Sequence, residues 1–367
     1  MIGQVTVGID VGCHKHRVAI VTPDGRVAEE FDMAPGKEGF EHFFARLDFY
    51  HKAFDMPVVV AMEGNGGYAR PLDRCVQLQG YTLLNVNNLK LCRFKEIFPS
   101  PAKTDAIDAR KIALLARAQV VLSPAKEVLQ EVREVPQEHQ VLKRLTRRRR
   151  QLVEEKVSIS NRMQADLQAV SPGLADIVEY KDGVAFLNFL THCSKLEDLS
   201  KLDKRELLSI RGIGEVFAQH VIKWQEEAYF SDEVAYVGPM IIEDARRIIE
   251  LKKSIKEIER EIENIAEGSP LAEAIGSIPG FGVVCTAELV AEIGTMERFS
   301  SERSLALYLG MAPLDKSSGK YQGTKTATQV NKRGKAAMMT AVAHHIRKVD
   351  ESKRYYQKKR GEGKSHN

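Results

Sequence analysis

Residues 5–12 read Val5-Thr6-Val7-Gly8-Ile9-Asp10-Val11-Gly12, and this stretch decides the fold that we expect for the N-terminal third. Its apolar residues alternate up to Asp10, which is the pattern of a buried strand that ends in an acid. A second apolar strand follows at Val18–Val21, and the turn Pro23-Asp24-Gly25 leads into a third strand that starts at Arg26. These residues predict three antiparallel strands at the start of the chain.

After the third strand, the pattern changes to strands that alternate with helices. The expected elements are a helix near Gly39–Phe54, a strand ending at Glu63, a helix near Tyr68–Gln79, a strand over Tyr81–Val86 and a helix beginning near Asp105. Three antiparallel strands followed by this alternation, with acids at strand ends, predict an α/β domain of the ribonuclease-H-like fold.

Four acids in this region form a candidate metal site. Asp10 and Glu63 end buried strands, whereas Asp105 and Asp108 are three residues apart on one face of a helix. Converging carboxylates cannot all stay ionised unless cations lie between them. Mg²⁺ is the expected cation, with Mn²⁺ as an alternative, because hard cations prefer oxygen ligands shared with phosphate. The implied chemistry is phosphoryl transfer. The alternative is a set of solvated surface acids, one of which stabilises a helix dipole.

Positive charge is unevenly distributed along the chain. The net charge is +4, but residues 315–367 hold 14 Lys and Arg against 4 Asp and Glu. A second cluster comprises Lys143, Arg144, Arg147, Arg148, Arg149 and Arg150. Such clusters are typical of proteins that bind a nucleic-acid backbone. The alternative is a solvated helix face or, after residue 350, a disordered tail.

Bulk composition excludes some classes of protein. No apolar run reaches 18 residues, and the five cysteines are scattered without CxxC spacing. We therefore expect a cytoplasmic protein with reduced thiols, without a membrane span, signal peptide, zinc site or disulfide framework. The expected parts are a metal-binding catalytic domain (1–125), a helical region (126–272), a C-terminal domain (273–350) and a basic tail (351–367).

The middle of the chain has helical periodicity. An apolar seam with 3-4 spacing comprises Ile248, Leu251, Ile255, Ile258, Ile262 and Ile265. This pattern predicts a coiled-coil hairpin that assembles a homodimer or tetramer. The alternative is an amphipathic helix buried in an ordinary bundle.

Two similar glycine patterns precede apolar helices. They are Ile210-Arg211-Gly212-Ile213-Gly214 and Ile278-Pro279-Gly280-Phe281-Gly282, and the second is the better match to a helix-hairpin-helix motif. Glycines permit the tight turn, and backbone N–H groups near Gly280 and Gly282 can bind a phosphate. The alternative is a helix–turn–helix without a ligand.

The C-terminal block predicts a flexible, basic loop in an otherwise mainly helical domain. This loop carries the adjacent hydroxyls of Ser317 and Ser318, and it leads to Lys332 and Arg333 at the start of a helix. These cations suit a scissile phosphate that a serine attacks. A serine-rich surface loop is the alternative.

These motifs together resemble transposases of the insertion-sequence family numbered one hundred and ten, which includes Piv-type recombinases. The residues that match the family's D, E, D, D positions are Asp10, Glu63, Asp105 and Asp108. The matching C-terminal motifs are Ile278-Pro279-Gly280-Phe281-Gly282, Tyr308-Leu309-Gly310-Met311-Ala312-Pro313, Ser317-Ser318-Gly319 and Asn331-Lys332-Arg333-Gly334. The resemblance covers roughly residues 3–120 and 270–350, whereas the middle matches only in being helical.

The resemblance implies a DNA recombinase with a RuvC-like catalytic domain of DEDD type. It further implies that a serine attacks DNA and forms a covalent phosphoserine, with Ser318 as the first choice and Ser317 as the second. Family members use a structured RNA as a guide, so DNA and a guide RNA are the expected partners. The main alternative is a RuvC-like nuclease that hydrolyses DNA with the same acids. A sugar-kinase or actin-like ATPase would need a second phosphate loop that this sequence lacks, and a non-catalytic helix-hairpin-helix protein would not need the acids.

Overall fold

The computed structural model describes residues 3–64, 70–97, 104–122, 129–319, 321–325, 327–328 and 330–365. Tyr68, expected in a helix, and Lys103, in the motif before Asp105, lie outside the described residues. The chain divides into two compact units, Met1–Glu134 (unit 1) and Val135–Asn367 (unit 2). The further division of unit 2 near residue 272 stays a prediction.

Unit 1 is built on a six-stranded sheet in the order β3-β2-β1-β4-β5-β6. Its strands are β1 (Val5–Val11), β2 (His16–Val21), β3 (Val27–Met33), β4 (Val58–Glu63), β5 (Thr82–Val86) and β6 (Gln130–Glu131). Strands β1, β2 and β3 pair antiparallel, whereas β1, β4 and β5 run parallel. The prediction of three antiparallel strands followed by strands that alternate with helices is therefore confirmed.

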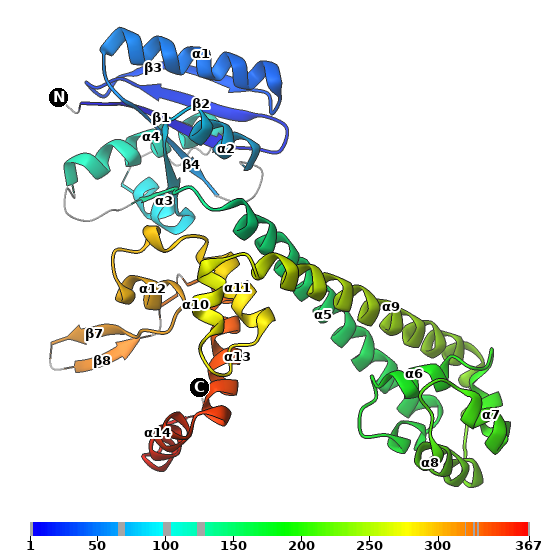
Figure 1. Cartoon of the computed structure of the whole chain (residues 1–367). Coiled ribbons are helices and arrows are strands. Elements are labelled where there is room, and N and C mark those ends of the chain that lie inside the picture. The colour runs from blue at the N-terminus through cyan, green and yellow to red at the C-terminus, as the bar shows by residue number, and fades with distance from the viewer. Residues whose placement is uncertain are drawn as a thin grey trace. The chain divides into compact units, whose positions relative to one another are not determined.

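Helices cover both faces of this sheet (Figure 1). They are α1 (Lys37–Phe54), α2 (Arg70–Leu78), α3 (Asn88–Lys95) and α4 (Asp105–Leu122). Side chains of α1 and α2, such as Phe43 and Leu72, pack with Val7 and Ile9 of β1. Side chains of α3 and α4 pack with alternate residues of β4, including Ala61. One face of the central strands is thus covered by α1 and α2 and the other by α3 and α4, because successive side chains of a strand point to opposite faces.

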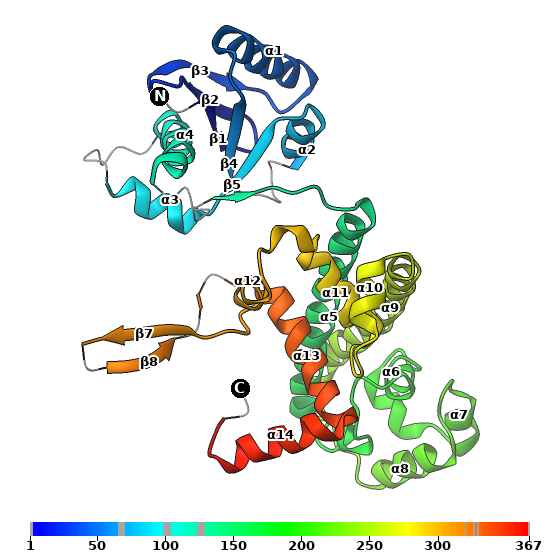
Figure 2. The same cartoon turned by 60° about the vertical axis from the view of Figure 1, so that its left-hand side comes forward.

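Unit 2 contains two long helices, α5 (Gln137–Val170) and α9 (Val234–Ala266). They lie side by side (Figures 1 and 2). Three members of the predicted seam, Ile248, Leu251 and Ile262, are buried. The remaining three are partly buried and pack against the same core clusters, which include residues of α5. The expected helical hairpin exists, but its seam is covered within the chain, so burial of the seam does not require a second copy.

A small helical module follows α5 and precedes α9. Its helices are α6 (Val184–Leu190), α7 (Lys204–Ser209) and α8 (Glu215–Glu226), with short 3-10 turns at Leu174–Ile177 and Leu196–Lys201. Trp224 lies at its centre, with edge-to-face contacts to Phe189 and Phe230. The glycine pattern at 210–214 connects α7 to α8, and Gly212 has a φ of +92°, which favours glycine.

The rest of unit 2 is mainly helical. It comprises α10 (Pro270–Gly276), α11 (Val283–Ile293), a 3-10 turn at Met296–Arg298, α12 (Glu302–Tyr308), the hairpin β7 (Leu314–Ser318) and β8 (Tyr321–Lys325), α13 (Lys332–Lys348) and α14 (Asp350–Gly361). The prediction of a mixed α/β N-terminal part and a mostly helical remainder is confirmed. None of the helices in the described ranges is long and apolar enough to cross a membrane.

Candidate active site

Strand register places the first two acids together. Ile9 of β1 is aligned with Met62 of the parallel strand β4, so Asp10 and Glu63 follow at the carboxyl ends of neighbouring strands. Val59 and Ala61 face the core beneath α4, and Glu63 continues that face of β4. Both acids therefore lie on the side of the sheet that α4 covers.

Close contact between β1 and α4 brings the second pair of acids to the first. A Cβ atom at Gly8 would overlap the Ala109 carbonyl oxygen and the Ala113 nitrogen of α4. Gly8 lies two residues before Asp10 on the same face of β1, and Ala109 directly follows Asp108. The contact thus sets the first turn of α4, with Asp105 and Asp108, near the end of β1.

Electrostatics show that the four acids interact. The pKa of Asp10 is raised to about 6: burial has the largest effect, the carboxylates of Asp108, Asp105 and Glu63 add to it in that order, and Lys95 acts in the opposite direction. A carboxyl with a pKa near neutrality is held half-buried among like charges. Such perturbed groups cluster at functional sites.

Lys95 at the end of α3 is a member of this site that the sequence analysis missed. Its ammonium lies 2.9 Å from Oδ1 of Asp108. Nothing in the local sequence distinguishes Lys95 from the other cations of α3, because the contact depends on the packing of α3 against α4. Within the described ranges, no three acidic, histidine or cysteine side chains are arranged to hold one metal ion. The carboxylate oxygens of the four acids suit a hard cation. In this arrangement, Lys95 neutralises part of their negative charge.

Ser317 and Ser318 lie on the β7–β8 hairpin of unit 2, where a flexible loop was expected. Ser317 pairs with Gln322 and Ser318 with Tyr321 across the two strands. Both serines are exposed. The strands were missed because polar residues occupy both faces, so the sequence shows no alternation of apolar and polar residues. Gly319, with a φ of +56°, starts the tight turn after Ser318.

The two faces of the hairpin differ in chemistry. Residues directly opposite in an antiparallel pair, and residues two apart along a strand, share a face. Ser318 therefore shares its face with Lys316, Gly323, Tyr321, Leu314 and Lys325. Ser317 shares the other face with Asp315, Gln322 and Thr324. The Ser318 face is cationic and carries an aromatic ring, whereas the charged residue on the Ser317 face is an acid.

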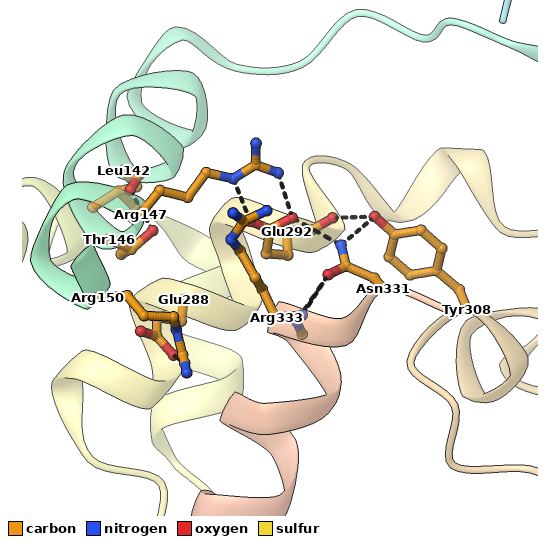
Figure 3. A network of polar contacts seen from close by, with 10 residues as sticks. Leu142, Thr146, Arg147, Arg150, Glu288, Glu292, Tyr308, Asn331 and Arg333 are labelled. Atoms are coloured by element: carbon orange, nitrogen blue, oxygen red, sulfur yellow. Dashed lines mark hydrogen bonds and ion pairs between the residues drawn. The ribbon is translucent and has the colours of Figure 1, made fainter. Parts of the chain in front are cut away.

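The start of α13, with the exposed Lys332 and Arg333, is held by a polar network (Figure 3). The Asn331 side-chain oxygen accepts from the backbone N–H groups of Arg333 and Gly334 at 3.1 and 2.9 Å. Its amide donates to Glu292 Oε2 at 2.8 Å and to the Tyr308 hydroxyl at 2.7 Å. This N-cap fixes the position of the two cations relative to α11.

Glu292 links this network to α5. Arg147 donates to both carboxylate oxygens of Glu292 at 2.7 and 3.0 Å, a bidentate pair. Burial raises the pKa of Glu292, but hydrogen bonds from Arg147 and Asn331 outweigh burial and leave this pKa below its usual range. Arg333 reaches from α13 toward the same glutamate and lines a narrow hollow beside it (Figure 3).

The arginine cluster of α5 is mostly engaged within the chain. Besides Arg147, Arg149 pairs with Glu259 at 2.6 Å and Arg150 with Glu288 at 2.6 Å. Arg148 is exposed, and the described contacts give it no partner. These ion pairs explain how adjacent arginines coexist on one helix. Binding of nucleic acid by Arg147, Arg148, Arg149 and Arg150 stays a prediction, for which Arg148 is the most available.

The glycine turn before α11 packs against α13. Gly280 has a φ of +94°, and a Cβ atom there would lie 2.5 Å from the backbone nitrogen of His345. His345 Nδ1 lies 2.6 Å from the Pro279 carbonyl oxygen. Gly280 is thus required for a close helix contact, whereas no atom lies within 4 Å of a Cβ at Gly282. Phosphate binding at this turn stays a prediction that falls mainly on Gly282.

A large open hollow lies in the small helical module. It has a volume of about 560 Å³ and is lined mostly by apolar residues of the segments 177–186 and 214–220. It belongs to neither the acids nor the hairpin.

Comparison with known proteins identifies relatives of this chain. A family model described as "Transposase" matches residues 7–172, and one described as "Transposase IS116/IS110/IS902 family" matches residues 272–357. The first includes the four acids, and the second includes the hairpin and the start of α13. The small module lies between the two matches.

Two similar proteins extend over nearly the whole chain. The insertion element IS116 uncharacterized 44.8 kDa protein of Streptomyces clavuligerus is 28% identical over 99% of this chain and 90% of its own length. The insertion element IS110 uncharacterized 43.6 kDa protein of Streptomyces coelicolor is 26% identical over 99% of this chain and 89% of its own length. Among solved structures, T. thermophilus RuvC in complex with a Holliday junction substrate matches 35% of this chain and 99% of its own, with 14% identity and a TM-score of 0.27.

Proposed function

Because the chain belongs to the IS110 family of transposases, which are DNA recombinases, we propose that it moves an insertion sequence through a covalent serine–DNA intermediate at a metal-dependent site. The observation that carries this proposal is the interaction of four acids from β1, β4 and α4: burial, together with the charges of Asp108, Asp105 and Glu63, raises the pKa of Asp10 to about 6. In this proposal, unit 1 has the ribonuclease-H-like (RuvC-like) fold. Its strand order, with three antiparallel strands beside parallel ones, supports that assignment.

The residues that would hold Mg²⁺ are Asp10, Glu63, Asp105 and Asp108. Their oxygen donors fit a hard divalent cation, and a cation there would relieve the repulsion that, after burial, contributes to the raised pKa of Asp10. When bound, such an ion supplies charge stabilisation to a reacting phosphoryl group. Lys95 competes for the same carboxylate of Asp108.

Ser318 is the proposed nucleophile. Its Oγ attacks the phosphorus of a DNA phosphodiester and gives up its proton to a base, while the bond from phosphorus to the leaving deoxyribose oxygen breaks and that oxygen takes a proton. A hydroxyl of another strand then attacks the phosphoserine and releases Ser318. Each step breaks one phosphoester bond and forms another, so strand exchange needs no ATP.

The hairpin supports Ser318 over Ser317. Lys316 and Lys325 share the face of Ser318 and would attract the phosphate that it attacks, whereas Asp315 on the face of Ser317 would repel it. His345, one of the two histidines nearest to Ser318 in sequence, has both ring nitrogens in contact with Pro279 and Ser352. We propose that the acids of unit 1 accept the serine proton.

The proposed partners are DNA and a structured guide RNA. Support comes from the exposed cations Arg148, Lys332 and Arg333 and from the basic helix α14, all of which suit a phosphate backbone. A homodimer or tetramer is the proposed assembly. Because the seam of α9 packs largely against its own chain, we propose a contact between protomers that does not depend on this seam.

The test uses a plasmid that carries this gene together with its natural flanking DNA. Ser318→Ala and Asp105→Ala should each lower recombination on the order of 10³-fold or more, while Ser317→Ala retains it. A protein–DNA adduct that survives denaturation should map to Ser318 by mass spectrometry. Recombination by Ser318→Ala at the wild-type rate would favour the hydrolytic alternative, in which water replaces the serine.

Metal binding is tested without reference to activity. Mg²⁺ should raise the melting temperature of the wild-type chain, because it neutralises the repelling acids, and Asp10→Asn should reduce this increase. If Mg²⁺ raised the melting temperatures of the wild-type chain and of Asp10→Asn equally, the acids would not be the metal ligands.

A further inference from the structure

Tyr321 occupies an unusual place on the Ser318 face of the hairpin. It is directly opposite Ser318, so the two Cβ atoms are about 5 Å apart. Tyr321 is 56% exposed. Within the described ranges its hydroxyl has no hydrogen-bond partner, so neither burial nor a polar contact explains an aromatic residue at this position.

Gly323 explains how the ring lies. A Cβ atom at Gly323 would approach the Tyr321 hydroxyl oxygen to 2.5 Å and Cζ to 2.8 Å. The ring of Tyr321 therefore folds back over Gly323, two residues along the same strand face, and lies along the hairpin. This arrangement leaves the other side of the ring open to solvent.

Cations flank this ring on the same face. Lys316 is opposite Gly323 and Lys325 is two residues beyond it, and both are exposed. An exposed aromatic ring between cations is the arrangement with which proteins hold a single nucleic-acid strand: the base stacks on the ring and the phosphates bind the cations. A hairpin with solvent on both faces is also marginally stable by itself, so a bound strand would stabilise it.

We infer that Tyr321 is a stacking platform for a base next to the phosphate that Ser318 attacks, with Lys316 and Lys325 on the adjoining phosphates. This inference rests on the proposed role of Ser318 and adds the residues that position the DNA strand. Tyr321 is a positioning residue here and takes no part in bond making. The strand is unpaired at this point, because a base within a duplex has no free face to stack on the ring.

The test measures contact of the ring with a base in the full-length chain. The probe is a mixed-sequence single-stranded DNA with 5-iododeoxyuridine in place of thymidine, cross-linked by light after binding is verified by fluorescence anisotropy. The cross-linked peptide should contain Tyr321. Tyr321→Leu should lower the yield at this peptide about five-fold or more, whereas Tyr321→Phe, which keeps the ring, should retain it.

Two further variants test whether the position of the Tyr321 ring matters, and not only its presence. Gly323→Val keeps Tyr321 but displaces its ring, and should lower the yield as Tyr321→Leu does. Gln322→Ala lies on the opposite face and should leave the yield unchanged. Equal cross-linking yields of wild type and Tyr321→Leu would overturn the inference, as would loss of cross-linking in Tyr321→Phe. The inference would also fail if Tyr321 were cross-linked to an RNA that carries iodouridine but not to the DNA.

The cross-link to Tyr321 does not depend on whether Ser318 is the nucleophile. Ser318→Ala should give the same cross-link, since the ring remains in place. A Tyr321 cross-link without any Ser318 adduct would remove the proposed nucleophile and keep the platform. A Ser318 adduct without the cross-link would remove the platform and keep the nucleophile.

Discussion

At the residue scale, single glycines and single ion pairs decide where the candidate groups lie. Gly8 has a role that its neighbours in the apolar run do not share, because α4 touches β1 at its Cα. The sequence predicts Asp10 as the end of a strand, but it does not predict that the preceding glycine sets the distance to Asp105 and Asp108. That distance is a product of packing between segments about a hundred residues apart.

Gly8→Ala should therefore displace α4. The added methyl overlaps backbone atoms of Ala109 and Ala113, and we expect a loss of about 1–3 kcal/mol in the free energy of unfolding. Urea denaturation measures this loss. Gly3→Ala is the matched control, because a Cβ atom at Gly3 has nothing within 4 Å. Equal stability of the two variants would mean that β1 and α4 are not in contact.

Glu292 gives a prediction with a defined dependence on pH. The pKa of Glu292 is lowered below 4.5 in the folded chain, so its contribution to stability is present above pH 4.5 and is lost as pH falls through the folded pKa. Glu292→Gln should reduce stability by about 1–3 kcal/mol near neutral pH, because Arg147 loses its bidentate partner.

The difference between wild type and Glu292→Gln should narrow as pH falls below 4.5. Urea denaturation across that range measures the narrowing. Glu261→Gln serves as a control, since Glu261 is exposed on α9 and has no ion pair among the described contacts. A difference that stays constant with pH would show that the carboxylate charge of Glu292 does not stabilise the fold.

At the scale of elements, periodic apolar patterns predict secondary structure correctly, whereas stretches of polar residues do not. The strands β1, β4 and β5 and the helix α9 follow from apolar periodicity. The β7–β8 hairpin was expected as a loop, since Lys316, Ser317 and Gln322 give no apolar face. Likewise, six clustered cations predict a binding surface, but the acids that neutralise several of them lie on α9 and α11, more than a hundred residues away.

Arg148 and Arg149 are neighbours on α5 that should behave differently. Arg148 is exposed, so Arg148→Ala should reduce the steepness of nucleic-acid affinity against salt concentration by about one unit of slope. Arg149 is paired with Glu259 at 2.6 Å, so Arg149→Ala should leave that slope unchanged and lower thermal stability. Titrations at several salt concentrations decide the matter. An equal loss of slope in both variants would show that the Arg149 pair opens to bind the backbone.

At the scale of the whole molecule, the proposed site is divided between the two units. The acids are on unit 1 and the serine hairpin is on unit 2. A serine hydroxyl is a weak nucleophile at neutral pH and needs a base or a metal ion beside it. Among the described contacts, Ser318 has no such group on its own hairpin. The proposed reaction therefore needs the acids of unit 1 and the serine of unit 2, either from one chain or from two.

Complementation between inactive variants distinguishes these arrangements. If the acids of one chain serve the serine of another, a mixture of Asp10→Ala and Ser318→Ala proteins contains assemblies with one intact site, and these should recombine DNA that neither variant recombines alone. Restored activity of about a quarter of the wild-type level or less is expected from random mixing in a dimer. As a control, a mixture of Asp10→Ala and Asp105→Ala, which both lack the acid site, should stay inactive. Activity absent from the first mixture, with mixed assemblies verified by affinity tags, would place Ser318 at the acids of its own chain.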